Sequence, residues 1–167
     1  DYPFPVAADY PDLLNIVEQR VKPERMTKND QLAKEKWWQF LRPRVELSEA
    51  IKHNKTVISL SRVGQSMGII ILPAGIVYSD SLVIIVYEIM SAFSIIQSRI
   101  HEIWARFFAS SMKDDLRYTP SDCFETFPFP DNFEDNQALE SIGKGYYKYR
   151  ADLMIRNNEG LTTTYNR

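Results

Sequence analysis

The first third of the chain has the spacing of hydrophobic residues that is typical of helices. Apolar residues within 11–21 recur every three or four positions and predict a helix there. Pro23 is expected to end or kink this helix, because proline has no backbone N–H to donate. Two further short helices are expected over residues 28–40 and 46–53. Residues 1–12, rich in proline and aromatic side chains, predict an extended linker.

Residues 56–87 have a different pattern, with runs of β-branched and aromatic residues separated by turn-forming residues. This pattern predicts three or four short strands, mostly arranged in hairpins. The expected strands cover residues 56–60, 67–72, 76–78 and 82–87. Gly64-Gln65-Ser66 is interpreted as one of the hairpin loops.

Helical spacing returns at residues 91–108, where apolar residues follow steps of three and four over four turns. Residues 110–122 are polar and predict a loop. Residues 123–127 are compatible with a short strand, which Pro128-Phe129-Pro130 would stop.

A last, long helix is expected to begin near Asn132 or Glu134 and to end at residues 157–160. Its apolar residues alternate in steps of three and four, as in the seam of a coiled coil. The seam residues are Leu139, Ile142, Tyr146, Tyr149 and Leu153. The predicted fold class is therefore α+β, a small mixed or antiparallel sheet packed on helices, with a long C-terminal helix.

Composition supports a folded core, since 44% of the 167 residues are hydrophobic and 13% are aromatic. The net charge of -2 argues against general binding of polyanions. Charge is unevenly distributed, however. Residues 20–62 contain eleven Lys/Arg and five Asp/Glu, whereas residues 114–160 contain five and ten. This asymmetry permits one basic face, although chance scatter on solvated surfaces would give the same count.

Cys123 is the only cysteine, which excludes an internal disulfide and fits a reducing, cytoplasmic location. No apolar run approaches the roughly 20 residues that span a bilayer, so no membrane partner is expected. The first residues do not resemble a signal peptide, and the missing initiator Met suggests a longer parent chain.

The motifs of independent catalysis are not found in the sequence. An amino-methyltransferase needs an Asn/Asp-Pro-Pro-aromatic motif, and no Asn or Asp here precedes Pro. The six glycines form no phosphate-binding loop, and no acid has Lys two positions later, as common nuclease cores do. His53, His101 and Cys123 lie too far apart for a short metal-binding motif. We therefore expect no catalytic residue, no metal ligand and no cofactor in this chain.

Three segments carry side chains suited to DNA. The string Trp37–Arg44 combines Gln39 with Arg42 and Arg44, which suit adenine, guanine and phosphate. Alternatively, its tryptophans anchor a core and its arginines pair with nearby acids.

The second segment, Ser61–Ser66, places Arg62, Gln65 and Ser66 at a predicted strand end and loop, although an ordinary polar turn has the same composition. The third, Ser110–Thr119, contains Lys113 and Arg117. Its acids, Asp114 and Asp115, would repel a phosphate. Bracing of the two basic side chains by these acids is therefore at least as good an interpretation as DNA contact.

Several segments together resemble a known family, the C-terminal part of large bacterial adenine-specific methyltransferases of the single-chain restriction-modification type (the MmeI-like and Eco57I-like group). The resemblance covers about residues 14–167. The segments that carry it are Val21–Arg25, Trp37–Arg44, Ser61–Val63, Gly75–Leu82, Gln97–Phe108 and Leu116–Pro130. The last of these is long and specific.

The resemblance implies a target-recognition domain over residues 13–130 and a C-terminal helical element over residues 131–167. It also implies that an upstream catalytic domain of the same polypeptide binds S-adenosylmethionine and methylates adenine N6 in double-stranded DNA, with the base flipped out. The implied DNA contacts are Lys22, Arg25, Gln39, Arg42, Arg44, Arg62, Gln65, Ser66, Lys113 and Arg117. The alternative is a scaffold that braces the catalytic domain while DNA is read elsewhere. The recognised sequence, DNA cleavage by the parent protein and the oligomeric state stay open.

Overall fold

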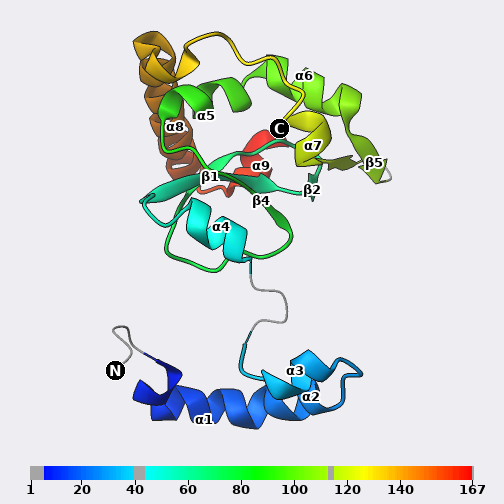
Figure 1. Ribbon diagram of the computed structural model, residues 1–167. Coiled ribbons are helices and arrows are strands. Elements are labelled where there is room, and N and C mark those ends of the chain that lie inside the picture. The colour runs from blue at the N-terminus through cyan, green and yellow to red at the C-terminus, as the bar shows by residue number, and fades with distance from the viewer. Residues whose placement is uncertain (1–5, 40–43, 113–114, 167) are drawn as a thin grey trace. The chain divides into compact units, whose positions relative to one another are not determined.

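The computed structural model describes residues 6–39, 44–112 and 115–166 of the chain (Figure 1). It divides into two compact units, Asp1–Ser48 and Glu49–Arg167. The domain bounds expected from the sequence, at residues 12 and 130, are separate from this division and stay a prediction.

The first unit is built from short helices. It contains the 3-10 helix η1 (Ala7–Asp9) and the helices α1 (Pro11–Arg20), α2 (Lys22–Met26) and α3 (Gln31–Glu35). The predicted helix 11–21 is confirmed. Of the expected extended linker, residues 7–9 form η1 and residues 11–12 begin α1, whereas residues 1–5 lie outside the described residues.

The break expected at Pro23 is confirmed, because α1 ends at Arg20 and Pro23 lies in the first turn of the separate helix α2, where its missing N–H leaves no hydrogen bond unmade. Another detail of the first unit differs from the prediction. The expected helix 28–40 is reduced to α3, which begins where the Asp30 carboxylate accepts a hydrogen bond from the Ala33 N–H.

The helix α4 (Val45–Ala50) spans the boundary and confirms the helix predicted at 46–53. After it, β1 (Thr56–Ser61), β3 (Ile70–Pro73) and β4 (Leu82–Ile85) form an antiparallel sheet in the order β3-β1-β4. Four successive residues of β1 are buried, so both faces of this strand are covered. The strand expected at 76–78 is wrong, because these residues form an irregular connection in which the Tyr78 hydroxyl donates to the Pro73 carbonyl.

A second small sheet was not predicted. β2 (Val63–Gly64), β6 (Asp115–Arg117) and β5 (Ser110–Met112) pair in the order β2-β6-β5. The segment 64–66 is therefore not a simple hairpin loop, and 110–122 is not a loop throughout. Residues 120–123 form the helix α7 (Pro120–Cys123), where the sequence had suggested that a strand begins at Cys123.

The helix expected over 91–108 consists of two helices, α5 (Met90–Ile96) and α6 (Arg99–Phe108). Ser98 separates them with extended backbone, and its hydroxyl accepts a hydrogen bond from the His101 N–H at 3.2 Å, which caps α6. Phe93 and Ile96 of α5 are buried in the same core cluster as Ile58 and Leu60 of β1. Figure 1 shows α5 and α6 on one side of the strands.

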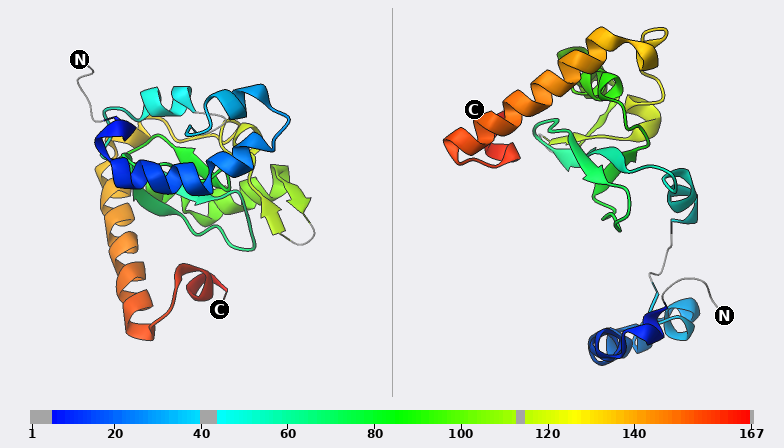
Figure 2. Two further views of the ribbon diagram at one scale, coloured as in Figure 1. Left: turned by 90° about the horizontal axis from the view of Figure 1, so that it is seen from below. Right: turned by 90° about the vertical axis from the view of Figure 1, so that its left-hand side faces the viewer.

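The long C-terminal helix is confirmed as α8 (Gln137–Asn157), preceded by the 3-10 helix η2 (Phe133–Asp135). Asn158 ends α8 in the left-handed conformation, and α9 (Leu161–Tyr165) follows (Figure 2). α8 packs along α5 through Gly143 and Arg150, whereas the predicted seam residues Ile142 and Tyr149 are exposed. No helix in the described ranges is both long and apolar enough to cross a membrane.

Candidate nucleic-acid interface

The segment between β2 and β3, residues 65–69, is held at its buried end by one glutamine of the turn between α5 and α6. The Gln97 amide donates to the Met67 carbonyl at 3.0 Å, and its oxygen accepts from the Ile69 N–H at 3.1 Å. Met67 and Ile69 are buried. We call residues 65–69 the connecting segment. The side chain of Gln97 therefore fixes the backbone of this segment at Met67 and Ile69.

Arg106 of α6 holds the outer end of the connecting segment. Its guanidinium donates to the Gln65 carbonyl at 2.6 Å and to the Glu102 carboxylate at 2.9 Å. Burial raises the pKa of Glu102, but hydrogen bonds from Arg106 and Arg99 outweigh it, and the pKa ends below its usual value. Within the described part of the chain, the side chains of Gln65 and Ser66 have no hydrogen-bond partner. They are therefore available to a ligand.

A buried arginine supports the connecting segment through Gln97. Arg150 of α8 is only 5% exposed, and its Nη1 donates to the Gln97 oxygen at 3.1 Å and to the Tyr165 hydroxyl at 3.0 Å. Its guanidinium lies 4.9 Å from the ring centre of Tyr147 and 5.7 Å from that of Phe93. Arg150 thus links α5, α8 and α9 to the connecting segment.

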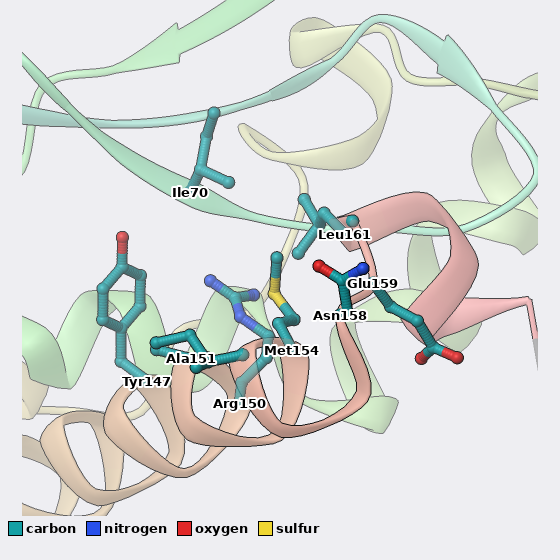
Figure 3. Close-up of a pocket in the computed structure, with 10 residues that line it drawn as sticks. Ile70, Tyr147, Arg150, Ala151, Met154, Asn158, Glu159 and Leu161 are labelled. Carbon is teal, nitrogen blue, oxygen red and sulfur yellow. The ribbon is translucent and has the colours of Figure 1, made fainter.

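Figure 3 shows Arg150 among the residues that line a cavity of about 640 Å³ at the turn between α8 and α9. Ile70, Ala151, Met154 and Leu161 supply much of this lining, and the hydrogen bonds of Arg150 hold the surrounding elements together. We interpret the residues around this cavity as structural, because they hold the connecting segment in place. The sequence named neither Arg150 nor Gln97 as a site residue. The available signals were an arginine within a patterned helix and the place of Gln97 at the start of a segment that carries the resemblance.

Two predicted basic residues flank β2. Arg62 precedes this strand, and its Nε donates to the Asp80 carbonyl at 3.0 Å. Its own carbonyl accepts from the Tyr118 N–H at 2.8 Å, which ties it to the end of β6. Arg117 of β6 is exposed and pairs across the sheet with Val63. The second sheet therefore brings Arg62 and Arg117 close to the connecting segment, although they are far apart in the sequence.

The first unit holds a separate group of predicted residues. Lys22 lies 2.6 Å from the Glu18 carboxylate and 4.9 Å from the ring centre of Trp37. Arg25 donates to the Gln39 carbonyl at 3.5 Å. Neither Trp37 nor Trp38 is fully buried, so the interpretation of both as core anchors is wrong.

One described residue among the predicted contacts, Arg44, belongs to neither group. Arg44 is exposed, and its carbonyl accepts a hydrogen bond from the Ser48 hydroxyl at 3.0 Å. Arg42 and Lys113 lie outside the described residues.

His101 is a structural residue beneath this surface. It is fully buried, and its Nε2 lies 2.9 Å from the hydroxyl of Tyr118, the residue whose N–H bonds to Arg62. Burial lowers the pKa of His101 to about 4, so the ring is neutral near pH 7. His101 is therefore a residue of the core. No group of three potential metal ligands occurs among residues 6–39, 44–112 and 115–166.

A family comparison identifies the domain that carries these surfaces. Residues 10–131 match the family model described as "MmeI, target recognition domain". The chain belongs to the MmeI target recognition domain family. The match includes both groups of candidate residues and ends before α8, and it confirms the resemblance seen in the sequence. No curated protein and no solved structure gives a significant match. The MmeI-type domain is the DNA target-recognition part of a restriction-modification methyltransferase, which assigns DNA binding to this fold.

Proposed function

We propose that this chain gives an adenine-N6 DNA methyltransferase its sequence specificity, and that the connecting segment reads base edges. One observation carries the proposal. Gln65 and Ser66 have free side chains, yet the backbone on either side of them is held, by Arg106 at the Gln65 carbonyl and by Gln97 at Met67 and Ile69. A binding group that is already ordered loses less conformational entropy when it binds.

The side chains near the connecting segment suit two different kinds of DNA contact, one to a base and one to a phosphate. An amide such as that of Gln65 can donate to and accept from adenine at once, which distinguishes adenine from the other bases in the major groove. Arg117 is exposed at the end of β6, the central strand of the small sheet next to the connecting segment, and its guanidinium suits a phosphate. Phosphate contacts would set the position of the duplex, and base contacts would select the sequence.

The chemical step is assigned, as part of the same proposal, to a catalytic domain of the same polypeptide. That domain would bind S-adenosylmethionine and receive the flipped adenine, and this chain would supply no group that takes part in methyl transfer. We also propose a bacterial, cytoplasmic location, which the match to a restriction-modification domain supports.

The decisive experiment compares Gln65→Ala with Gln137→Ala in the intact enzyme. Gln137 is an exposed glutamine at the start of α8 and serves as the matched control. We expect Gln65→Ala to change the set of methylated sites, measured by sequencing of modified DNA, and Gln137→Ala to leave it unchanged. An unchanged set of sites in Gln65→Ala would remove this residue from the reading of bases.

Arg117 is tested separately by the salt dependence of DNA binding. Loss of one phosphate contact weakens binding to all sequences and reduces the slope of log affinity against log salt by about 1. We expect this for Arg117→Ala, measured by fluorescence anisotropy, and no change for Lys148→Ala on the exposed side of α8. The same slope in both variants would contradict a phosphate contact at Arg117.

A second candidate function, docking on the catalytic domain, is favoured by one specific observation. Ile100, Ile103 and Phe107 lie on one face of α6 and are 73%, 58% and 80% exposed. Exposed apolar faces of this kind often mark protein interfaces. If docking is the main role, Phe107→Asp will abolish binding of this chain to the isolated catalytic domain, and the chain will have no affinity for DNA at low salt.

A further inference from the structure

The short C-terminal helix α9 is fixed against the connecting segment, although it lies outside the family match. Asn158 turns the chain back after α8. Leu161 then packs so closely on Gly68 that a Cβ on this glycine would lie 2.9 Å from the Leu161 Cδ2. At the other end of α9, the Tyr165 hydroxyl bonds to Arg150 at 3.0 Å and to the Tyr146 hydroxyl at 2.7 Å. Both ends of α9 are therefore held in place.

This packing creates a cavity of about 340 Å³ beside Gln65 and Ser66. Its lining comes from four parts of the second unit: the end of β1, β2 with the connecting segment, the start of β6, and α9 with the residue that follows it. The polar residues among them are Ser61, Gln65, Ser66, Asp115, Thr162 and Asn166. The cavity thus brings α9 next to the residues that the sequence suggested for reading bases.

The groups that line the cavity suit a base edge better than a phosphate. Gln65 and Asn166 each offer an amide donor and an amide acceptor, and Thr162 offers a hydroxyl. Asp115 adds a carboxylate, which repels phosphate but accepts a hydrogen bond from the amino group of cytosine. Among the described residues, neither Lys nor Arg lines this cavity.

We propose that α9 completes the base-reading pocket, with Thr162 and Asn166 acting beside Gln65 as specificity-determining residues. The ligand is the major-groove edge of one base pair, contacted at the exocyclic amino group of its adenine or cytosine. This inference rests on the proposed function, and it extends the recognition surface beyond residue 131, where the family match ends.

The side chains of Thr162 and Asn166 are free to act in this way. Both residues are exposed, and in the described part of the chain their side chains have no hydrogen-bond partner. The Asn166 N–H donates to the Thr162 carbonyl at 3.1 Å, which ties the backbone of the two residues together. The neighbouring Thr163 is also exposed but does not line the cavity, and it provides a matched control.

The test uses the intact methyltransferase and a library of duplexes that carry every base at each position of its recognised site. We expect Asn166→Ala and Thr162→Val to reduce discrimination at one position by roughly tenfold, the effect of losing one base contact. The slope of DNA affinity against salt should stay unchanged, because no phosphate contact is lost. Asn166→Asp, which keeps the shape but removes the amide donors, should change the preferred base at that position. Thr163→Val should have no effect on any of these quantities.

The outcomes separate this inference from the function on which it rests. If Gln65→Ala changes the methylated sites while Asn166→Ala, Asn166→Asp and Thr162→Val do not, α9 does not read DNA and the proposed function stands. If none of these variants changes the methylated sites, both proposals fail. A reduced salt slope in Asn166→Ala would show a phosphate contact and would overturn base reading by α9. The melting temperature of each variant shows whether it is folded, and Asn166→Asp keeps the test valid if Asn166→Ala unfolds.

Discussion

The Nη1 of Arg150 lies 3.1 Å from the side-chain oxygen of Gln97, 53 residues away in the sequence. The same oxygen accepts a hydrogen bond from the backbone N–H of Ile69. A buried cation on α8 is therefore connected through one amide group to the segment proposed to read DNA. The same arginine also bonds to Tyr165, so it supports both sides of the proposed pocket.

Replacement of Arg150 is expected to destabilise the protein strongly. Arg150→Met removes the hydrogen bonds to Gln97 and Tyr165 and the contacts with the surrounding rings, and it should lower the free energy of unfolding by about 3 kcal/mol. Urea-induced unfolding measures this change. Arg156→Met, at an exposed position of the same helix, should lie within about 0.5 kcal/mol of the wild type. Equal stability of the two variants would contradict a supporting role for Arg150.

Two glycines of α8 should respond in opposite ways to the same substitution. A Cβ on Gly143 would lie 2.2 Å from the Met90 carbonyl oxygen, whereas a Cβ on Gly145 has no neighbouring atom within 4 Å. Gly143→Ala should therefore force α5 and α8 apart and cost about 2 kcal/mol or more. Gly145→Ala should stabilise the helix by up to about 1 kcal/mol. Thermal unfolding of both variants checks this pair, and a stabilised Gly143→Ala would show that the helices do not pack so closely.

The stability of the protein should fall between pH 6.5 and pH 4. Burial lowers the pKa of His101 to about 4 in the folded state, whereas the unfolded chain takes up this proton near pH 6.5. Since the unfolded state binds more protons in this window, the free energy of unfolding decreases as the pH falls, by about 3 kcal/mol in total. Urea unfolding at a series of pH values measures this decrease.

Two variants isolate the contribution of His101. His101→Phe should remove most of the slope between pH 6.5 and pH 4.5, while His53→Gln, at an exposed position, should retain it. Glu88, Glu102 and Glu140 have lowered pKa values, so they lose their stabilising contacts only below this range. An unchanged slope in His101→Phe would assign the pH dependence to other groups.

Local sequence patterns were sufficient for several elements of the fold. The spacing of apolar residues predicted α1, α4 and α8, because amphipathic periodicity and caps such as Asn158 act within a few residues. β-Branched runs predicted β1 and β4 for the same reason. The pattern did not reveal the break at Ser98, because the apolar spacing continues across it and only the capping hydrogen bond separates the two helices.

Packing between distant segments decided the remaining features. The apolar steps of α8 suggested a seam through Ile142 and Tyr149, yet the buried face contains Gly143 and Arg150. A small residue allows close approach to Met90, and a cage of rings stabilises the arginine, so hydrophobicity alone did not identify the buried side.

The candidate site likewise has a part that the sequence predicted and a part that only the tertiary structure revealed. Composition was enough to select Gln65, Ser66 and Arg62 as residues suited to DNA, because hydrogen-bonding capacity belongs to each side chain by itself. Only the tertiary structure joined them to Arg117 through the pairing of β2 with β6, and to Asn166 through the return of α9. Strand pairing and helix docking depend on contacts between residues far apart in the chain, and a pattern within one short segment carries no information about such contacts.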